Sequence, residues 1–524
     1  MTQTTGNGPL RDHAPVRFRR WDAWSQPAYR RTEPVRDWAE SRPWLAEISI
    51  GVLAALLFSW RIGRSSPWWD EAITRDVTSR PASAIIDLVG HVDLVHATYY
   101  LLIHALIGES PSVTPIRLIS AAAAALTAAV LIRLGRELGN AQVGVAAGVM
   151  FTIAPLSTRY AQEARPYALV ALAATLSTLA LVRLCRRPWL PMRWAVYLAS
   201  LVVLGLLNVL GLLMIVVHLC YLLPTSSAAV RRRWYAACAA AAVVLSPLLY
   251  AAAHQREQVA WLPKPRFDQL TGFLLAQYAT GIFVVVLLVI AVAGLARGGT
   301  HAPSLGLGLA WAFIPPVVLW TVSQAHPLFD WRYVFFTVPG GALALASLAP
   351  LLRARLMTVS LVVLALLGLH MQSVYRYLAS GHGENLRGTA EAIRDHAQAG
   401  DAVIFLPGSR RVVKLAYPED FGTVDDVALA QTGEQSATLM GVEEPTAEIA
   451  AELKHRNRVW VVTGSPRFGE GPSISETAKE HLIYDHYRLS GVALSGRYEV
   501  RLYVRSRSQI PSPGIQQGTG QQTR

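Results

Sequence analysis

The chain has 524 residues, of which 52% are hydrophobic and 16% are charged, and its formal net charge is +13. Soluble globular proteins carry about 25% charged residues, so a large part of this surface faces something other than water. The arginines lie beside apolar runs. We therefore interpret the positive charge as the arginine excess that marks the cytoplasmic ends of membrane spans, and we expect no nucleic-acid partner. The three cysteines show no spacing typical of a zinc site or a disulfide framework.

The first 44 residues are polar and rich in arginine, and the first apolar run begins near Leu45. A signal peptide has only a short charged region before its apolar core, so we expect residues 1–44 to be a disordered, basic cytoplasmic tail. A spanning helix needs roughly 20 mainly apolar residues. Candidate spans lie at about 45–63, 115–135, 140–158, 164–183, 194–207, 209–224, 233–253, 271–296, 303–323, 333–350 and 356–373.

These runs predict an α-helical polytopic membrane protein with about 11–13 transmembrane helices. The stretch 97–108 is apolar but short, so a short span, a re-entrant segment and an interfacial helix are all open for it. Arginine clusters at 132–137, 182–193 and 231–233 lie at one end of their apolar segments, which places that end and the N-terminal tail in the cytoplasm. The loop 64–96 then lies on the extracytoplasmic side of the plasma (inner) membrane.

The region after the last apolar run has a different pattern. Strand-like runs alternate with helical ones, which predicts a small extracytoplasmic α/β domain at 375–508, after a transmembrane domain at 45–374. The strand-like runs are Ala402–Leu406, Val459–Thr463 and Tyr498–Val504, and the helical ones are Leu386–Gln398 and Thr446–His455. Residues 509–524 are rich in Gln, Pro, Ser and Gly, and we expect them to be disordered.

Two adjacent carboxylates, Asp70 and Glu71, follow the first span directly, after Trp68 and Trp69. A carboxylate at membrane depth is costly and therefore indicates a functional site, although an ordinary solvated loop is the alternative. Asp93 and His96 precede the apolar stretch 97–108. Asp93 could cap a helix there, or it could join His91 and His96 in a divalent-metal site, for which the spacing is not diagnostic.

Three further charged residues lie in the segment Arg159–Tyr167, between two predicted spans. Glu163 and Arg165 could form a structural ion pair, or Arg159 or Arg165 could hold a phosphate. Arg332 begins a late span, where it is either a snorkelling arginine or another phosphate ligand. The sequence holds no P-loop, GxGxxG, GxSxG or HExxH motif in a suitable context, which argues against ATP-driven transport and the common hydrolases.

Four motifs together resemble the glycosyltransferase-C superfamily, and family 39 within it, which includes protein O-mannosyltransferases. WWDEA after the first span looks like the Asp-Glu region of the first loop, and the run from Asp93 through HATYYLLIHALIG to IRLIS resembles its continuation. RYAQEARPYAL and WRYVFFTVPGGALALA are similar to two later family segments. The match covers about residues 45–350, with the motifs in family order.

The resemblance implies transfer of a sugar, with mannose as the family-level expectation, from a polyprenyl-phosphate donor to a hydroxyl on a lipid, glycan or protein. It implies Asp70 as the general base, with Glu71 as the fallback, and inversion at the anomeric carbon. Residues expected to orient donor or acceptor are Asp93, His96, Tyr99 and Glu163, and those expected to bind phosphate are Arg165, Arg332 and Arg159. We predict no defined cofactor, with a divalent metal as the open alternative.

Two other functions compete with a transferase. A lipid or glycan transporter or flippase would show internal repeats and helices broken at mid-membrane, whereas the candidate charges here gather at one face. A non-catalytic membrane assembly protein would need Asp70 only for stability.

Overall fold

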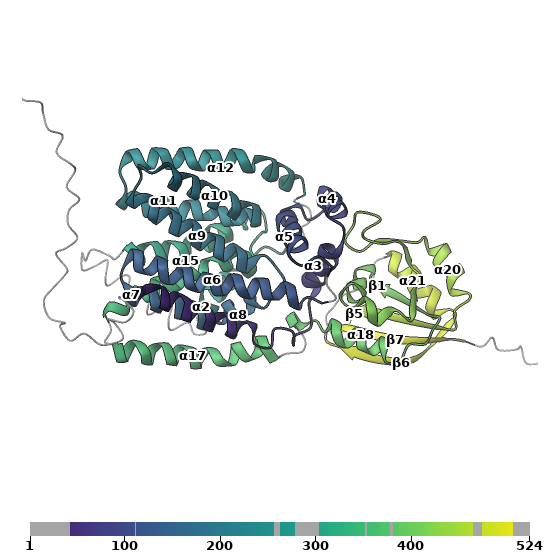
Figure 1. Ribbon diagram of the computed structural model, residues 1–524. Coiled ribbons are helices and arrows are strands. Elements are labelled where there is room, and N and C mark those ends of the chain that lie inside the picture. The colour runs from purple at the N-terminus through teal and green to yellow at the C-terminus, as the bar shows by residue number, and fades with distance from the viewer. Residues whose placement is uncertain are drawn as a thin grey trace, which may run out of the picture.

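The computed structural model describes residues 42–109, 112–255, 262–277, 303–351, 354–377, 381–464 and 474–506. They form a bundle of roughly parallel helices and a C-terminal α/β region, with short helices between the two (Figure 1). Most of the predicted tail 1–44 and all of the predicted tail 509–524 lie outside the described residues.

The bundle contains helices of very different length. In chain order they are α2 (Pro43–Ser59), α6 (Thr114–Leu138), α7 (Ala141–Ile153), α8 (Pro155–Ala161), α9 (Tyr167–Arg186), α10 (Pro191–Leu207), α11 (Met214–Thr225), α12 (Ala228–His254), α13 (Phe267–Ala276), α15 (Pro303–Val322), α16 (Val338–Ala346) and α17 (Ala354–Tyr377). Among the described residues, five helices are long and apolar enough to cross a membrane, and the pair α7 and α8, bent by 64°, makes a sixth. The predicted number of 11–13 transmembrane helices is larger because it also counts shorter apolar helices such as α10. It also counts the predicted span 271–296, most of which lies outside the described residues.

The outer helices of the bundle expose apolar surface. The most apolar stretch of α9 is 72% buried, but those of α12 and α17 are only 11% and 17% buried at similar hydropathy. Apolar helices that the protein itself does not cover need lipid around them. The predicted polytopic helical membrane fold is therefore confirmed.

The first loop and the apolar stretch after it are helical. They consist of α3 (Trp69–Ser79), α4 (Ala82–His91), a short 3-10 turn (Leu94–His96) and α5 (Ala97–Ile107). At 1.5 Å per residue, the 11 residues of α5 extend about 16 Å, well short of the roughly 30 Å hydrocarbon core. Helices α3–α5 lie between the bundle and the α/β region (Figure 1), so the stretch 97–108 does not cross.

The C-terminal region is a five-stranded mixed sheet with helices. The strand order is β2-β1-β5-β7-β6, in which β1 pairs in parallel with β2 and β5, and β7 pairs antiparallel with β5 and β6. Its elements are α18 (Leu386–Arg394), β1 (Asp401–Leu406), α19 (Val412–Ala416), β2 (Val424–Asp426), β3 (Leu429–Gln431), β4 (Val442–Glu443), α20 (Thr446–Leu453), β5 (Arg458–Gly464), α21 (Ile474–Tyr484), β6 (Tyr487–Ser495) and β7 (Tyr498–Arg505). The predicted small α/β unit is confirmed.

Three arginines join the α/β region to the first loop. Arg387 at the start of α18 donates to the carbonyls of Gly63 and Arg64, at 3.0 and 2.9 Å. Arg75 of α3 donates to the carbonyl of Leu415 at 2.9 Å, and Arg80 donates to two carbonyls of the loop after β3. Buried apolar side chains of α3–α5 and of the α/β region also share one hydrophobic cluster, so the two parts are packed as one body there.

A buried ion pair anchors the first loop to the bundle. Arg117 of α6 contacts Glu71 through two nitrogens, at 2.6 and 2.8 Å, and the two side chains are only 2% and 1% exposed. The remaining Arg117 donors reach backbone carbonyls that include those of Ile62 and Ser65. Glu71 also accepts from the backbone N–H of Ala164 at 2.7 Å. One carboxylate thus connects α3, α6 and the turn before α9.

We expect the Glu71→Ala variant to lose about 3–5 kcal/mol of stability, because a buried guanidinium would be left without its carboxylate. Thermal unfolding of the detergent-purified protein measures the loss. The Asp395→Ala variant removes an exposed partner of Arg394 and should leave the unfolding temperature nearly unchanged. Equal unfolding temperatures for Glu71→Ala and the wild type would contradict the anchoring role.

Candidate active site

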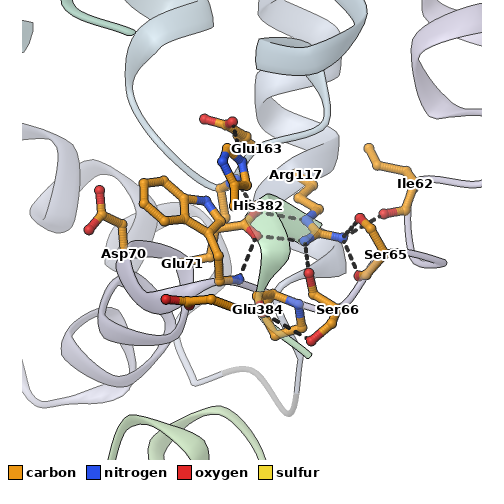
Figure 2. A network of polar contacts seen from close by, with 12 residues as sticks. Ile62, Ser65, Ser66, Asp70, Glu71, Arg117, Glu163, His382 and Glu384 are labelled. Carbon is orange, nitrogen blue, oxygen red and sulfur yellow. Dashed lines mark hydrogen bonds and ion pairs between the residues drawn. The ribbon is translucent and has the colours of Figure 1, made fainter. Parts of the chain in front are cut away.

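Asp70 lies in the first turn of α3 and faces a cavity. Successive helical residues point about 100° apart, so Asp70 cannot share the surroundings of Glu71. Figure 2 shows the Asp70 carboxylate pointing away from the Glu71–Arg117 pair. Arg332 donates from Nη1 to Asp70 Oδ2 at 2.8 Å, and Nε of Arg165 lies 3.8 Å from the same oxygen. The predicted base and two predicted phosphate ligands therefore meet, although they come from three distant segments.

Several contacts hold Arg332 in place. It lies in a 3-10 turn (Trp331–Thr337), and its backbone N–H donates to Asp330 Oδ1 at 3.0 Å. The other Asp330 oxygen lies 3.5 Å from Nε of Arg332. Its guanidinium lies over the rings of Trp68 and Tyr333, each at 5.3 Å. Burial alone lowers the pKa of Arg332, but Tyr167 and Asp70 outweigh this effect and raise it. Arg332 is thus a fixed positive charge at the cavity.

Arg165 is oriented by a neutral histidine. Its Nη2 lies 2.8 Å from Nε2 of His96, and its Nη1 donates to the hydroxyl of Thr74 at 3.2 Å. Burial lowers the pKa of His96 well below its usual range, and the nearby charges of Arg165 and Arg332 lower it further. A neutral imidazole can accept from Arg165, so we assign His96 to positioning this guanidinium.

Asp93, Tyr99 and the neighbouring Tyr100 contact groups other than the Asp70 carboxylate. Asp93 adopts a left-handed backbone conformation (φ 60°) and accepts from the hydroxyl of Tyr100 at 2.9 Å. Tyr99 and Tyr100 are fully buried in the core beneath the first loop. His91 is exposed and contacts the carbonyl of Asp87, away from His96. Among the described residues, no three His, Cys, Asp or Glu side chains gather as a metal site would require.

Glu163 belongs to a second charged group beside the first. Its Oε1 lies 2.7 Å from Nε2 of His382 and 3.6 Å from Nε of Arg159, and Arg159 Nη2 lies 3.1 Å from the other His382 nitrogen. Burial alone raises the pKa of Glu163, but His382 and Arg159 outweigh it and hold the pKa below its usual value. His382 also stacks on Trp68, with ring centroids 4.3 Å apart.

A cavity of about 530 Å³ is lined by Asp70, Arg332 and the Glu163 group, whereas Arg165 and His96 lie outside its lining. Its lining comes from both the bundle and the α/β region, and consists of Trp68, Trp69, Asp70, Arg159, Tyr160, Glu163, Asp330, Arg332, His382, Glu384 and Arg497. Glu71 is absent from this lining and instead borders a smaller cavity of about 210 Å³. Both Glu71 oxygens are engaged by Arg117 and backbone N–H groups, so the geometry does not favour Glu71 as the fallback base.

His382, Glu384 and Arg497 were not among the residues selected from the sequence. Glu384 accepts from the backbone N–H of Trp69 at 2.8 Å, and burial raises its pKa. In the sequence, the polar run from His382 to Asn385 follows the last apolar run, on the side assigned to the first loop. This signal could have indicated His382 and Glu384 as candidate site residues. Arg497 lies in the turn between β6 and β7, and no sequence signal connects it to Asp70.

No protein-family model matches the chain, and no curated protein matches it. Among solved structures, it is similar to ArnT from Cupriavidus metallidurans in the apo state, with a TM-score of 0.57 and 14% identity over 88% of this chain and 98% of ArnT. ArnT bound to undecaprenyl phosphate gives a TM-score of 0.57 and 13% identity over 90% and 100%. The arabinofuranosyltransferase AftD from Mycobacteria matches with a TM-score of 0.48 and 16% identity, over 89% of this chain and 42% of AftD. The chain therefore has the glycosyltransferase-C fold that its sequence motifs indicate.

Proposed function

We propose that this protein is a membrane glycosyltransferase that moves a sugar from a polyprenyl-phosphate donor to an acceptor hydroxyl. The observation that carries the proposal is one carboxylate, Asp70, that lines a cavity at the end of the bundle and contacts two guanidinium groups, Arg332 in the cavity lining and the buried Arg165. A carboxylate suits proton abstraction, and paired guanidinium groups suit a phosphate. ArnT, which shares the fold, was solved with undecaprenyl phosphate bound.

The proposed step needs no group outside the donor, the acceptor and these residues. The acceptor oxygen attacks the anomeric carbon, its proton passes to the Asp70 carboxylate, and the bond from the anomeric carbon to the phosphate oxygen breaks. Arg165 and Arg332 stabilise the negative charge that develops on the departing polyprenyl phosphate. A single displacement of this kind inverts the anomeric centre. A retained configuration in the product would contradict this mechanism.

The ion pairs also indicate an order of events. Asp70 neutralises Arg332 at 2.8 Å. A donor phosphodiester, which carries one negative charge on two non-bridging oxygens, would compete with the Asp70 carboxylate for the same guanidinium and free the Asp70 oxygen to accept a proton. Glu163, His382 and Glu384 also line the cavity, and we propose that the acceptor binds beside them. We further propose an extracytoplasmic site in the plasma membrane, mannose as the sugar and a cell-envelope acceptor.

Replacing the proposed base gives the main test. We expect the Asp70→Asn variant to transfer sugar about 100-fold to 10,000-fold more slowly, because the amide cannot take the proton. The assay follows label from polyprenyl-phosphomannose into a crude envelope extract, with decaprenyl-phosphoarabinose as a second donor. The Asp87→Asn variant changes an exposed carboxylate on the neighbouring helix α4 and should keep full activity. Undiminished transfer by folded Asp70→Asn protein would move the base elsewhere, and no transfer by the wild type from either donor would count against the proposed donors.

Replacing a proposed phosphate ligand should affect donor binding first. We expect the Arg332→Lys variant to raise the KM for the donor by about tenfold, because an ammonium cannot reproduce the planar two-point contact. Steady-state rates at varied donor concentration separate KM from kcat. The Arg266→Lys variant changes a guanidinium that is 82% exposed and serves as the control. An unchanged donor KM in Arg332→Lys would show that Arg332 serves only to neutralise Asp70.

A further inference from the structure

A second cavity lies at the opposite end of the bundle. It has a volume of about 670 Å³, and its lining is almost entirely arginine: Arg133, Arg136, Glu137, Arg183, Arg186, Arg187 and Arg193. Helices α6 and α9 begin near the Asp70 cavity, with Arg117 and just after Arg165, and they end at this second cavity. The 25 residues of α6 extend about 37 Å, so the two cavities are separated by about a membrane thickness.

The charges at this second cavity are not balanced by the described protein groups. Glu137 lies 2.9 Å from Arg183 and 3.3 Å from Arg186, and Glu47 of α2 lies 3.4 Å from Arg133. These two carboxylates face six arginines. Nη1 of Arg136 is buried without a hydrogen bond among the described residues, and Glu47 is 3.7 Å away from it. A converging set of guanidinium groups in surplus favours binding of a polyanion, and their forked donors match phosphate oxygens.

The surroundings of the cavity favour a lipid over a soluble phosphate. Between Arg187 and Arg193, at the junction of α9 and α10, the chain exposes apolar side chains, of which Trp189 is 68% and Met192 is 72% exposed. Tryptophan is enriched at the membrane–water interface, and apolar side chains beside it suit acyl chains. The arginine excess also agrees with the cytoplasmic side of a membrane, where anionic lipids concentrate.

We propose that this cavity binds the headgroup of an anionic phospholipid in the leaflet on this side, with the phosphates held by Arg186, Arg187 and Arg193 and the acyl chains beside Trp189. Glu137 pairs with Arg183 and Arg186 in the lining of the cavity. Basic pockets between transmembrane helices on this side of a membrane are a recognised type of headgroup site. The proposal does not depend on the reaction at Asp70.

Native mass spectrometry of the full chain in neutral detergent tests the proposal. The protein is mixed with cardiolipin, phosphatidylglycerol or phosphatidylcholine of matched acyl chains, and separately with pyrophosphate. We expect cardiolipin to be retained most strongly and phosphatidylcholine least. The Arg186→Gln/Arg187→Gln variant should lower cardiolipin affinity by about tenfold or more, since each arginine near anionic lipid contributes about a fivefold effect.

The matched control is the Arg232→Gln/Arg233→Gln variant, which removes two exposed arginines at the start of α12, on the same side but outside the cavity. Equal loss of cardiolipin in both variants would overturn the proposal, because it would show general attraction to a basic face. Equal retention of all three lipids would overturn it too. Pyrophosphate that displaces cardiolipin at equal concentration would assign the cavity to a soluble anion instead. Should Arg186→Gln/Arg187→Gln fail to fold, Arg186→Ala alone and the wild-type lipid ranking decide between these outcomes.

Discussion

The ion pair between Glu71 and Arg117 is the interaction on which the arrangement of the site depends. Both groups are almost completely buried, so neither can be exposed to solvent or left alone without a large cost. The pair joins α3 to α6, and further contacts of the same two side chains reach the end of α2 and the turn before α9. The first loop is therefore a fixed part of the bundle, and its neighbouring residue Asp70 is held at a defined edge.

This constraint separates the roles of two adjacent carboxylates. Glu71 is enclosed by donors, whereas Asp70, one position earlier on the helix, faces a cavity and meets Arg332 and Arg165. The two arginines are themselves oriented by Asp330, His96 and Thr74. In the proposed reaction, positive charge would thus be in place before the donor phosphate binds, and such pre-organisation stabilises charge that develops in a transition state.

The α/β region is part of the cavity rather than an appendage. Arg387 donates to a backbone carbonyl of the first loop, and Arg75 and Arg80 of the first loop donate to backbone carbonyls of the α/β region. Apolar side chains of both parts share one hydrophobic cluster. His382 and Glu384, just after α17, are brought against Trp68 and Trp69 by this packing. Arg117 of α6 and Arg165, just before α9, are paired with carboxylates at one end of the bundle, whereas the other ends of α6 and α9 carry arginines in excess.

The sequence alone determined the class of the protein and its most informative segments. Long apolar runs require a membrane, because backbone groups in lipid must be satisfied within helices, and short apolar, strand-like runs such as Ala402–Leu406 indicated the sheet. The motifs around Asp70, Arg165 and Arg332 were recognisable because each is a local pattern. Tertiary structure alone decided that Asp70 faces the cavity while Glu71 is buried, since that depends on Arg117, 46 residues away. It also decided the packing of the short helix α5 and the positions of His382, Glu384 and Arg497, because contacts between distant segments leave no periodic signal in the chain.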